Sequence, residues 1–430
     1  MILKNITFQV FLAALLGVGA AMLFADESWL TFPHPPTYEI IIGLKNFFLA
    51  ALRMLIAPMI FFSLIGGIIS IGNVVKLRRL GGITVTYYLG TTSVAILLAL
   101  VAVFFIHPWT AYPAMPELAN GNGPASMIDP GDDSLIRVIS QLLTLAFTNP
   151  FTALVELNIL GIVTNAFLIG LAIILALPED SHIFKLVADI NLVIYRVLAW
   201  VIRLLPLGIF AILFDFTVKL SVGDGHSEAL LTQLFQFSLL VVGLTAIHGL
   251  IILPGIAWML TGRAPLPLLS QLARPLLVAF STSSSSATLP VSMRTAEEDL
   301  KVSPAVSSFV LPLGATMNMD GTALFEAVAA VFLAYLFGVE LSVVGVFTVF
   351  LMSMVASIGA PGMPSASMAG MQMVLLAVGI PLEAIAILMV IERPLDTIRT
   401  AVNVEGDLIG SLVVDHVTSS RDEHPRGRSG

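Results

Sequence analysis

The sequence predicts an all-α membrane protein with eight transmembrane helices and two re-entrant helical hairpins. Of its 430 residues, 57% are hydrophobic and 11% are charged, and the mean hydropathy is +0.97. A soluble chain carries roughly 25% charged residues. Apolar stretches of about 20 residues, the length of a membrane-spanning helix, recur along the chain. They are continuous rather than alternating in polarity, which disfavours a membrane barrel of strands.

Six apolar stretches precede residue 265, and several are too long for a single perpendicular crossing of the bilayer. Tilted or kinked helices are therefore expected, with Pro58, Pro150 and Pro206 as candidate kink points. The first stretch is too long for a removable signal peptide and is interpreted as a retained helix. The predicted spans are 5–25, 38–72, 80–106, 136–177, 183–218 and 229–261.

Basic residues concentrate in or near alternate connections, while the other connections carry acidic residues almost without Lys or Arg. By the positive-inside rule, this asymmetry predicts a multi-pass protein of the cell (inner) membrane whose N- and C-termini are cytoplasmic. The polar stretch 417–430 is predicted to be a disordered cytoplasmic tail. The absence of cysteine excludes thiol chemistry and cysteine-ligated metals, and no basic patch indicates a nucleic-acid partner.

Two stretches after residue 264 are apolar on both sides of a polar tip but too short to cross the bilayer twice. The first, 265–293, contains the serine run 281–286, and the second, 343–379, contains two glycines and two prolines near its middle. Both patterns predict re-entrant hairpins, in which two half-helices meet where protein or water surrounds them. A polar helix follows each hairpin at a similar offset, which indicates inverted repeats of one hairpin-plus-helix unit.

The helix after the second hairpin carries one polar stripe. Its members are 4, 3, 4 and 4 residues apart and lie within roughly 80° of arc, at about 100° per residue. Apolar residues before and after the stripe disfavour a solvent-facing position, so we expect it to face other protein. The stripe comprises Glu392, Asp396, Arg399, Asn403 and Asp407.

Asn318 and Asp320 stand two positions apart in the helix after the first hairpin. On a regular helix their side chains would point about 200° apart, so either they serve two sites or the helix unwinds at 318–321. Unwinding frees backbone carbonyls, which together with an amide oxygen and a carboxylate suit a small cation. A buried amide satisfied by backbone is an alternative for Asn318 alone, but it explains a buried Asp in the same turn poorly.

Four motifs, in this order, resemble those of the dicarboxylate/amino acid:cation symporter family, which includes the excitatory amino acid transporters. They are 281–290 (STSSSSATLP), 311–324 (LPLGATMNMDGTAL), 356–359 (ASIG) and 399–407 (RTAVNVEGD). The resemblance covers nearly the whole chain. It implies a sodium-coupled importer of glutamate or aspartate, not an enzyme, with sodium as the coupling ion and no cofactor.

The resemblance also implies a homotrimer in the lipid bilayer that works by an elevator mechanism. Residues 1–264 would form transmembrane helices 1–6, a trimerisation scaffold from which helices 3 and 6 join the transport domain. Residues 265–416 would form hairpin 1, helix 7, hairpin 2 and helix 8, which together make the substrate and ion binding core. Residues 417–430 would be the tail.

Roles for single residues follow from the resemblance. Arg399 would pair with the side-chain carboxylate of the substrate, a bidentate match for a guanidinium group, and Asp396 would take the substrate ammonium. Further polar contacts would come from Thr322, Thr400 and Asn403. Backbone at the two hairpin tips would hold the α-carboxylate, helped by half-helix N-termini. These tip residues are Ser284, Ser285, Ser286, Gly359 and Gly362.

Three sodium sites are implied in the same way. The first comprises Gly314, Asn318, Asn403 and Asp407. The second comprises Tyr88, Thr91, Thr92, Asn318 and Asp320. The third, built largely from backbone oxygen, comprises Thr316, Met319, Ser357, Ile358 and Gly359.

Glu326 matches the position that carries a proton in glutamate-transporting relatives. Its sequence neighbours are apolar, and burial among them would favour the neutral acid. Two interpretations follow: a protonated core residue bonded to backbone, or a carrier that takes a proton on one side of the membrane and releases it on the other.

Several residues depart from the family pattern, and other functions were weighed. Arg393 stands where small or apolar residues are usual, beside Glu392 where Asp is common, which leaves the identity of the substrate open. An intramembrane serine hydrolase would need a Gly-x-Ser-x-Gly elbow and a paired histidine, and neither is evident. A passive anion channel is a second rival. A C4-dicarboxylate carrier is the runner-up, although Asp396 would then lack an amine, and a neutral amino-acid carrier would leave Arg399 without its partner.

Overall fold

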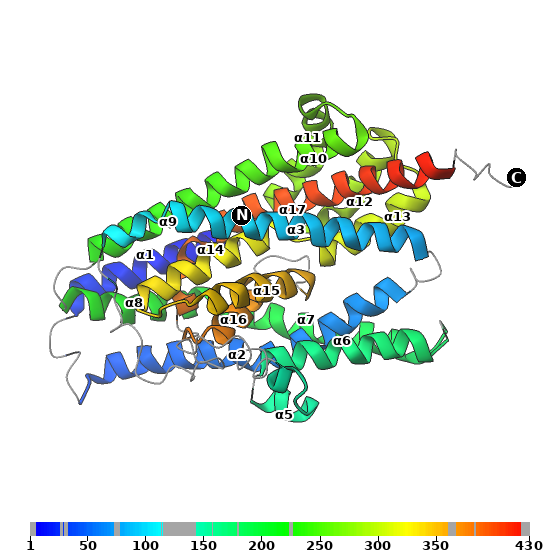
Figure 1. Cartoon of the computed structure of the whole chain (residues 1–430). Helices are drawn as coiled ribbons and strands as arrows, with labels where there is room; N and C mark the ends of the chain where they lie inside the picture. Colours follow the sequence, from blue (N-terminus) through cyan, green and yellow to red (C-terminus); the bar gives the residue numbers. More distant parts are fainter. Residues whose placement is uncertain are drawn as a thin grey trace, which may run out of the picture.

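The computed structural model describes residues 6–25, 29, 33–72, 78–112, 114, 143–156, 158–178, 180–222, 227–359, 367–381 and 384–422. Helices make up most of these residues, and no strand occurs among them. The predicted all-α class is therefore confirmed. Figure 1 shows long helices that run roughly parallel to one another.

The first part of the chain packs mainly on itself. Helix α1 lies against α8, and α2 lies against α6, α7 and α8. In Figure 1, α2, α6 and α7 form one edge of the molecule. The elements are α1 (Ile6–Phe24), α2 (Pro36–Gly72), α3 (Arg78–Phe105), η3 (Pro108–Ala111), α5 (Pro150–Val155), α6 (Ile159–Ala176), α7 (His182–Arg203) and α8 (Leu205–Val222).

Prolines mark several of the helix boundaries and bends in this part. Pro150 is the first residue of α5 and Pro206 the second of α8, positions where the missing N–H costs no hydrogen bond. Helices α7 and α8 meet at 51°, so the predicted span 183–218 is bent beside Pro206. Pro58 lies inside α2. Of the predicted span 136–177, residues 136–142 lie outside the described residues.

The second part of the chain surrounds α14. This helix packs against α3, α9, α15, α16 and α17, and α17 runs beside both α3 and α9 (Figure 1). The elements are α9 (Ser227–Ile247), the π-helical turn η5 (His248–Ile252), α10 (Leu253–Thr261), α11 (Pro265–Thr282), α12 (Ser285–Glu298), α13 (Pro304–Met317), α14 (Asp320–Leu336), α15 (Val343–Gly359), α16 (Ser367–Ala377) and α17 (Ile385–Asp422).

Both predicted hairpins consist of two helices that pack on each other, α11 on α12 and α15 on α16. The first pair turns at Ser283, whose φ of 50° puts it in the left-handed region. Ser284 then caps α12, because its side chain accepts a hydrogen bond from the N–H of Ala287 at 3.2 Å. The tip of the second pair, 360–366, lies outside the described residues, and so do Pro361 and Gly362.

Helices α13 and α14 are the most deeply buried of the three candidate spans in the described residues. Of the apolar window within Pro304–Leu336, 89% is buried, against 39% for the comparable windows of Leu80–Ala111 and Ala229–Thr261. These three helices are long and apolar enough to cross a membrane, and α7 with α8 would make a fourth if counted as one bent span. This search covers only the described residues, so the number of eight transmembrane helices stays a prediction.

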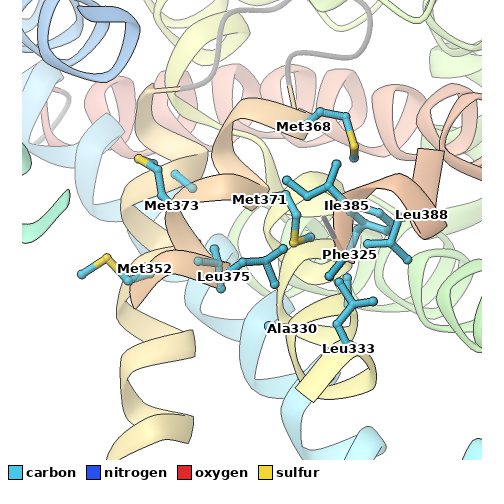
Figure 2. Packing of buried hydrophobic residues seen from close by; sticks show 14 of the residues in the cluster. Phe325, Ala330, Leu333, Met352, Met368, Met371, Met373, Leu375, Ile385 and Leu388 are labelled. Carbon is cyan, nitrogen blue, oxygen red and sulfur yellow. The ribbon is translucent and has the colours of Figure 1, made fainter. Parts of the chain in front are cut away.

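A methionine-rich core holds α14 in place. Figure 2 shows Phe325 of α14 beside Met371 of α16 and Leu388 of α17, and all three are fully buried. Met is unbranched and fills irregular gaps between helices. This packing fixes the polar first turn of α14 relative to α16 and α17.

The C-terminal helix is longer than the sequence analysis expected. Helix α17 continues to Asp422, so residues 417–422 of the predicted disordered tail are helical. The physical reason is that the apolar face of 408–414 packs in the core and the helix continues past it. Residues 423–430 lie outside the described part of the chain.

Candidate functional site

The helix break between α13 and α14 organises the site. Asn318 and Met319 leave the helical region, with φ, ψ of −113°, 89° and −124°, 59°. Of the two predicted alternatives, the helix does unwind, but only at Asn318 and Met319, because α14 already begins at Asp320. The break lets Asn318 and Asp320 turn their side chains toward different neighbours, and both are fully buried.

The first polar cluster joins the end of α13 to α17 and α3. Asn318 Nδ2 donates to Asp407 Oδ1 at 3.0 Å. Gly314 has no side chain, and a Cβ there would collide with the carboxylate of Asp407 and the hydroxyl of Tyr88. Tyr88 itself donates to the carbonyl of Val310 at 2.9 Å. The glycine therefore allows one carboxylate and one phenol to meet the broken helix at close range.

Asn403, the remaining member of the first predicted sodium set, lies one turn before Asp407 on α17. Its Oδ1 accepts the N–H of Gly321 at 2.8 Å, and its Nδ2 donates to Thr322 Oγ1 at 3.2 Å. The first of these bonds satisfies one of the free N–H groups in the first turn of α14, and the second ties Asn403 to a side chain of the same turn. A Cβ at Gly321 would meet the backbone of Arg399, so this glycine sets how closely α14 approaches α17.

The second polar cluster surrounds the carboxylate of Asp320. Thr92 Oγ1 donates to Asp320 Oδ1 at 2.6 Å, and Thr91 Oγ1 lies 3.4 Å from the same oxygen and 3.5 Å from Asn318 Oδ1. All four side chains are buried. The structure thus brings together most of the second predicted sodium set, across a sequence separation of more than two hundred residues.

The third predicted sodium set is less connected. Thr316 Oγ1 donates to the carbonyl of Leu313, and Ser357 Oγ donates to the carbonyl of Met354, so each hydroxyl is bonded to its own helix. Helices α13 and α15 are in contact, and Met319 is buried. Ile358 and Gly359 end α15, next to the undescribed tip.

The polar stripe of α17 faces protein, and Arg399 is at its centre. Arg399 is fully buried, and its Nη2 lies 3.1 Å from Glu392 Oε1 and 3.4 Å from Asp396 Oδ1. Its guanidinium carbon stands 4.0 Å from the centroid of the Phe325 ring. Within the described part of the chain, Nε and Nη1 of Arg399 have no hydrogen-bond partner. Two nitrogens of a buried cation, which together carry three N–H donors, are therefore available to a ligand.

The surroundings of Arg399 link it to the second hairpin. Glu392 Oε1 also accepts from Ser367 Oγ of α16 at 3.3 Å, so one carboxylate contacts both the arginine and the hairpin. Thr400 is buried beside it. At the first hairpin, Ser284 and Ser285 are buried and Ser286 is exposed. Helices α11 and α12 both pack on α17. Gly362, the other predicted tip residue, lies outside the described residues.

Glu326 lies two turns into α14, inside the methionine-rich core. It is fully buried, and neither carboxyl oxygen has a hydrogen-bond partner among the described residues. A Cβ on Gly370 of α16 would collide with its Oε1. The carboxyl group therefore points at the second hairpin. A lone buried carboxylate is costly in such surroundings, so this residue is an unusual one for a packed interior.

His248 is a site residue that the sequence analysis did not identify. It is fully buried in η5, and its Nε2 lies 3.1 Å from Asp320 Oδ2. A histidine within an apolar span was the available signal, because ionisable groups at membrane depth are rare and functional.

The arrangement offers oxygen ligands rather than a transition-metal centre. No group of three or more His, Cys, Asp or Glu side chains that could hold a metal ion occurs among the described residues. Carboxylates, an amide group and hydroxyls meet instead at the break between α13 and α14. Such hard ligands suit a small cation of low charge better than zinc or copper.

Comparisons with known proteins identify the family of this chain. A model of the sodium:dicarboxylate symporter family matches residues 6–417. An excitatory amino acid transporter of Caenorhabditis elegans is 33% identical over 87% of this chain and 81% of its own length. The neutral amino acid transporter B(0) of Oryctolagus cuniculus is 31% identical, over 95% and 78%. The neutral amino acid transporter A of Homo sapiens is 31% identical, over 86% and 74%.

The chain belongs to the sodium:dicarboxylate symporter family. The family predicted from the four motifs is thus confirmed. Its members are multi-pass membrane transporters and not enzymes, so the serine hydrolase alternative is wrong. The relatives include excitatory and neutral amino acid transporters, and the choice between these substrate classes depends on this chain's own site.

Proposed function

We propose that this protein is a secondary active symporter that imports acidic amino acids, glutamate or aspartate, with sodium ions and a proton. The observation that carries the proposal is Arg399. It is fully buried, its Nη2 is engaged by Glu392 and Asp396, and its Nε and Nη1 have no partner in the described residues. The side-chain carboxylate of an acidic substrate can accept a charge-assisted hydrogen bond from either of these unpartnered nitrogens.

The unpartnered donors also argue against the two nearest alternatives. A neutral amino acid would leave them unsatisfied, and a buried donor without an acceptor costs about 1–3 kcal/mol, or more for a charged group. A C4-dicarboxylate would satisfy Arg399 but would bring no ammonium to Asp396. An amino acid with an acidic side chain matches both charges.

Sodium coupling is supported by the oxygen ligands at the helix break. Asp320 and Asp407 are buried carboxylates with hydroxyl or amide neighbours. A bound monovalent cation would neutralise a charge that otherwise stands in a protein interior. Proton coupling is assigned to Glu326, because its carboxyl group points at α16 of the second hairpin. A movement of this hairpin would change the surroundings of the carboxyl group and hence its affinity for a proton.

The larger architecture is part of the same proposal. We infer a homotrimer in which most of residues 1–264 form the scaffold. Residues 265–416 would move through the membrane as an elevator together with transmembrane helices 3 and 6, the predicted spans 80–106 and 229–261. The termini would be cytoplasmic. Helices α3 and α9 lie in these two spans, and their packing against α14 and α17 supports their inclusion in the moving part.

Uptake into proteoliposomes tests the proposal. Labelled aspartate, glutamate, succinate and alanine are supplied with a sodium gradient, a proton gradient or neither. We expect concentrative uptake of aspartate or glutamate that requires sodium. Equilibration of substrate without concentration would indicate a passive channel. Preferential uptake of succinate would indicate a C4-dicarboxylate carrier, and preferential uptake of alanine a neutral amino-acid carrier.

The sodium assignment is tested with Asp407→Asn. The substitution removes the charge that a bound ion neutralises, so we expect the sodium concentration for half-maximal uptake to rise at least about 10-fold. Loss of a group that only supports a metal ligand already lowers metal affinity by about this factor. Undiminished uptake at low sodium would show that Asp407 is no ligand. Asp415→Asn provides a matched control, because Asp415 lies two turns further along α17 and bonds Ser303.

A further inference from the structure

We infer that His248 is a positioning residue for the proposed cation site, and that its Nε2–H donor orients the carboxylate of Asp320. This inference rests on the proposed function, in which Asp320 binds sodium. His248 and Asp320 belong to α9–α10 and α14, are 72 residues apart in sequence, and are both fully buried. A carboxylate can only accept hydrogen bonds, so at this contact the hydrogen belongs to Nε2 of the imidazole.

The contacts of Asp320 divide between its two oxygens. Oδ1 receives the hydroxyl of Thr92 at 2.6 Å, with Thr91 at 3.4 Å, and Oδ2 receives His248 at 3.1 Å. With a donor on each oxygen, the carboxylate cannot rotate without breaking one of these bonds. The carboxylate is thereby held in one orientation, and second-shell groups that fix a ligand in this way are what a cation site needs.

The backbone of α9–α10 places His248 where it can do this. The helix widens to a π-turn at His248–Ile252, where the N–H of Leu253 donates to the carbonyl of His248, five residues earlier. Pro254 follows and has no N–H, so the regular α-helical pattern fails just before it. Single π-turns occur frequently at functional sites because they shift a side chain relative to the flanking helix.

The π-turn η5 also packs closely against α17. A Cβ on Gly249 would meet Val402 and the carboxylate oxygen Oε2 of Glu405. His248 therefore enters the site along a backbone packed tightly on the helix that carries Asp407. In the described residues, His248 Nδ1 has no partner, so the contact with Asp320 is the only hydrogen bond of this ring there.

The test compares two amide substitutions of similar polarity. In His248→Gln, the side-chain amide nitrogen can reach the place of Nε2, whereas in His248→Asn it stops near the place of Nδ1. The full-length protein is assayed in two ways: sodium dependence of aspartate uptake at saturating aspartate, and the rise of the thermal unfolding temperature with sodium in detergent. The second readout needs no transport.

We expect His248→Asn and His248→Leu to raise the half-saturating sodium concentration by about 10- to 100-fold, the usual effect of removing a group that orients a metal ligand. His248→Gln should stay within about threefold of the unmodified protein, and aspartate affinity at saturating sodium should change little in all three. Thr245→Val is the matched control, one turn earlier, buried, and without a hydrogen-bond partner in the described residues.

Asp320→Asn separates the inference from the function on which it rests. If Asp320→Asn raises the sodium requirement, adding His248→Leu to it should cause no further rise, because both act through one carboxylate. If Asp320→Asn has this effect but His248→Asn and His248→Leu leave sodium dependence unchanged, the inference is overturned and the sodium site stands. Equal impairment by Gln and Asn would also overturn it, since packing alone would then explain the loss. If Asp320→Asn itself changes nothing, the proposed site at Asp320 fails as well.

Discussion

Two buried ion clusters in this protein differ in how completely they are satisfied. Between α2 and α8, Asp215 accepts Tyr38 Oη at 2.6 Å on one oxygen and Lys45 Nζ at 2.7 Å on the other. On α17, a single nitrogen of Arg399 holds Glu392 and Asp396 at 3.1 and 3.4 Å, and two further nitrogens have no partner in the described residues.

The difference distinguishes a structural contact from a binding site. The short bonds at Asp215 use both carboxylate oxygens, so this cluster joins two helices and has no evident role for a ligand. The longer bonds at Arg399 engage one corner of a five-donor group. Buried charge with unused donors is costly to keep, and a transporter can offset that cost each time an anionic substrate binds.

The largest expected effect is at the satisfied cluster. Asp215→Leu leaves the Lys45 ammonium buried without its partner, which should destabilise the protein by about 3–5 kcal/mol. Thermal unfolding in detergent measures this loss. The double variant Lys45→Met/Asp215→Leu removes both charges and should recover most of the stability. An unchanged unfolding temperature in the single variant would mean that the pair contributes nothing to the fold.

Arg399 should respond in the opposite way, with a large effect on binding rather than on folding. Arg399→Ala should weaken acidic substrates by about 2–5 kcal/mol, while alanine and serine lose less or gain. Equilibrium binding of labelled aspartate, with unlabelled alanine as competitor, measures both. Arg294→Ala is the control, since Arg294 is exposed and pairs only with Glu298 in the described residues. Unaltered aspartate binding would make Arg399 a structural residue like Lys45.

Glu326 is a third case, a buried acid whose carboxyl oxygens have no hydrogen-bond partner among the described residues. Glu326→Gln imitates the neutral acid permanently. Substrate exchange should continue without pH dependence between roughly pH 5.5 and pH 8.5, and net uptake should slow if the empty carrier returns deprotonated. Glu340→Gln, at an exposed carboxylate after α14, should leave the profile intact. A variant profile that matches the original would leave Glu326 a packing residue.

The smallest expected effect concerns the first hairpin. Ser284→Ala removes the cap of α12 and should cost about 1 kcal/mol of stability. Ser286→Ala, at an exposed position two residues later, should cost little. Thermal unfolding of the two variants compares them directly, and equal losses would show that the capping bond seen at Ser284 does not matter to the hairpin.

Features that depend on local chemistry could be read from the amino-acid sequence. Hydropathy indicated the all-α class, and the residues at 318–321 marked the place where the helix breaks. Helical periodicity put Glu392, Asp396 and Arg399 on one face, where the structure pairs them. These features could be predicted because helix propensity, periodicity and hydropathy act between residues that are near in the chain.

Which distant groups meet depends on the packing of whole helices. Thr92 and Asp320 are 228 residues apart, Lys45 and Asp215 are 170 apart, and His248 reaches Asp320 from a third segment. No local pattern encodes such contacts, because they depend on how whole helices pack and on glycines that let them approach, such as Gly314 beside Asp407. The unpartnered donors of Arg399 could not be predicted from the sequence for the same reason. Whether a buried group has all its hydrogen-bond partners depends on every neighbour that the fold brings to it.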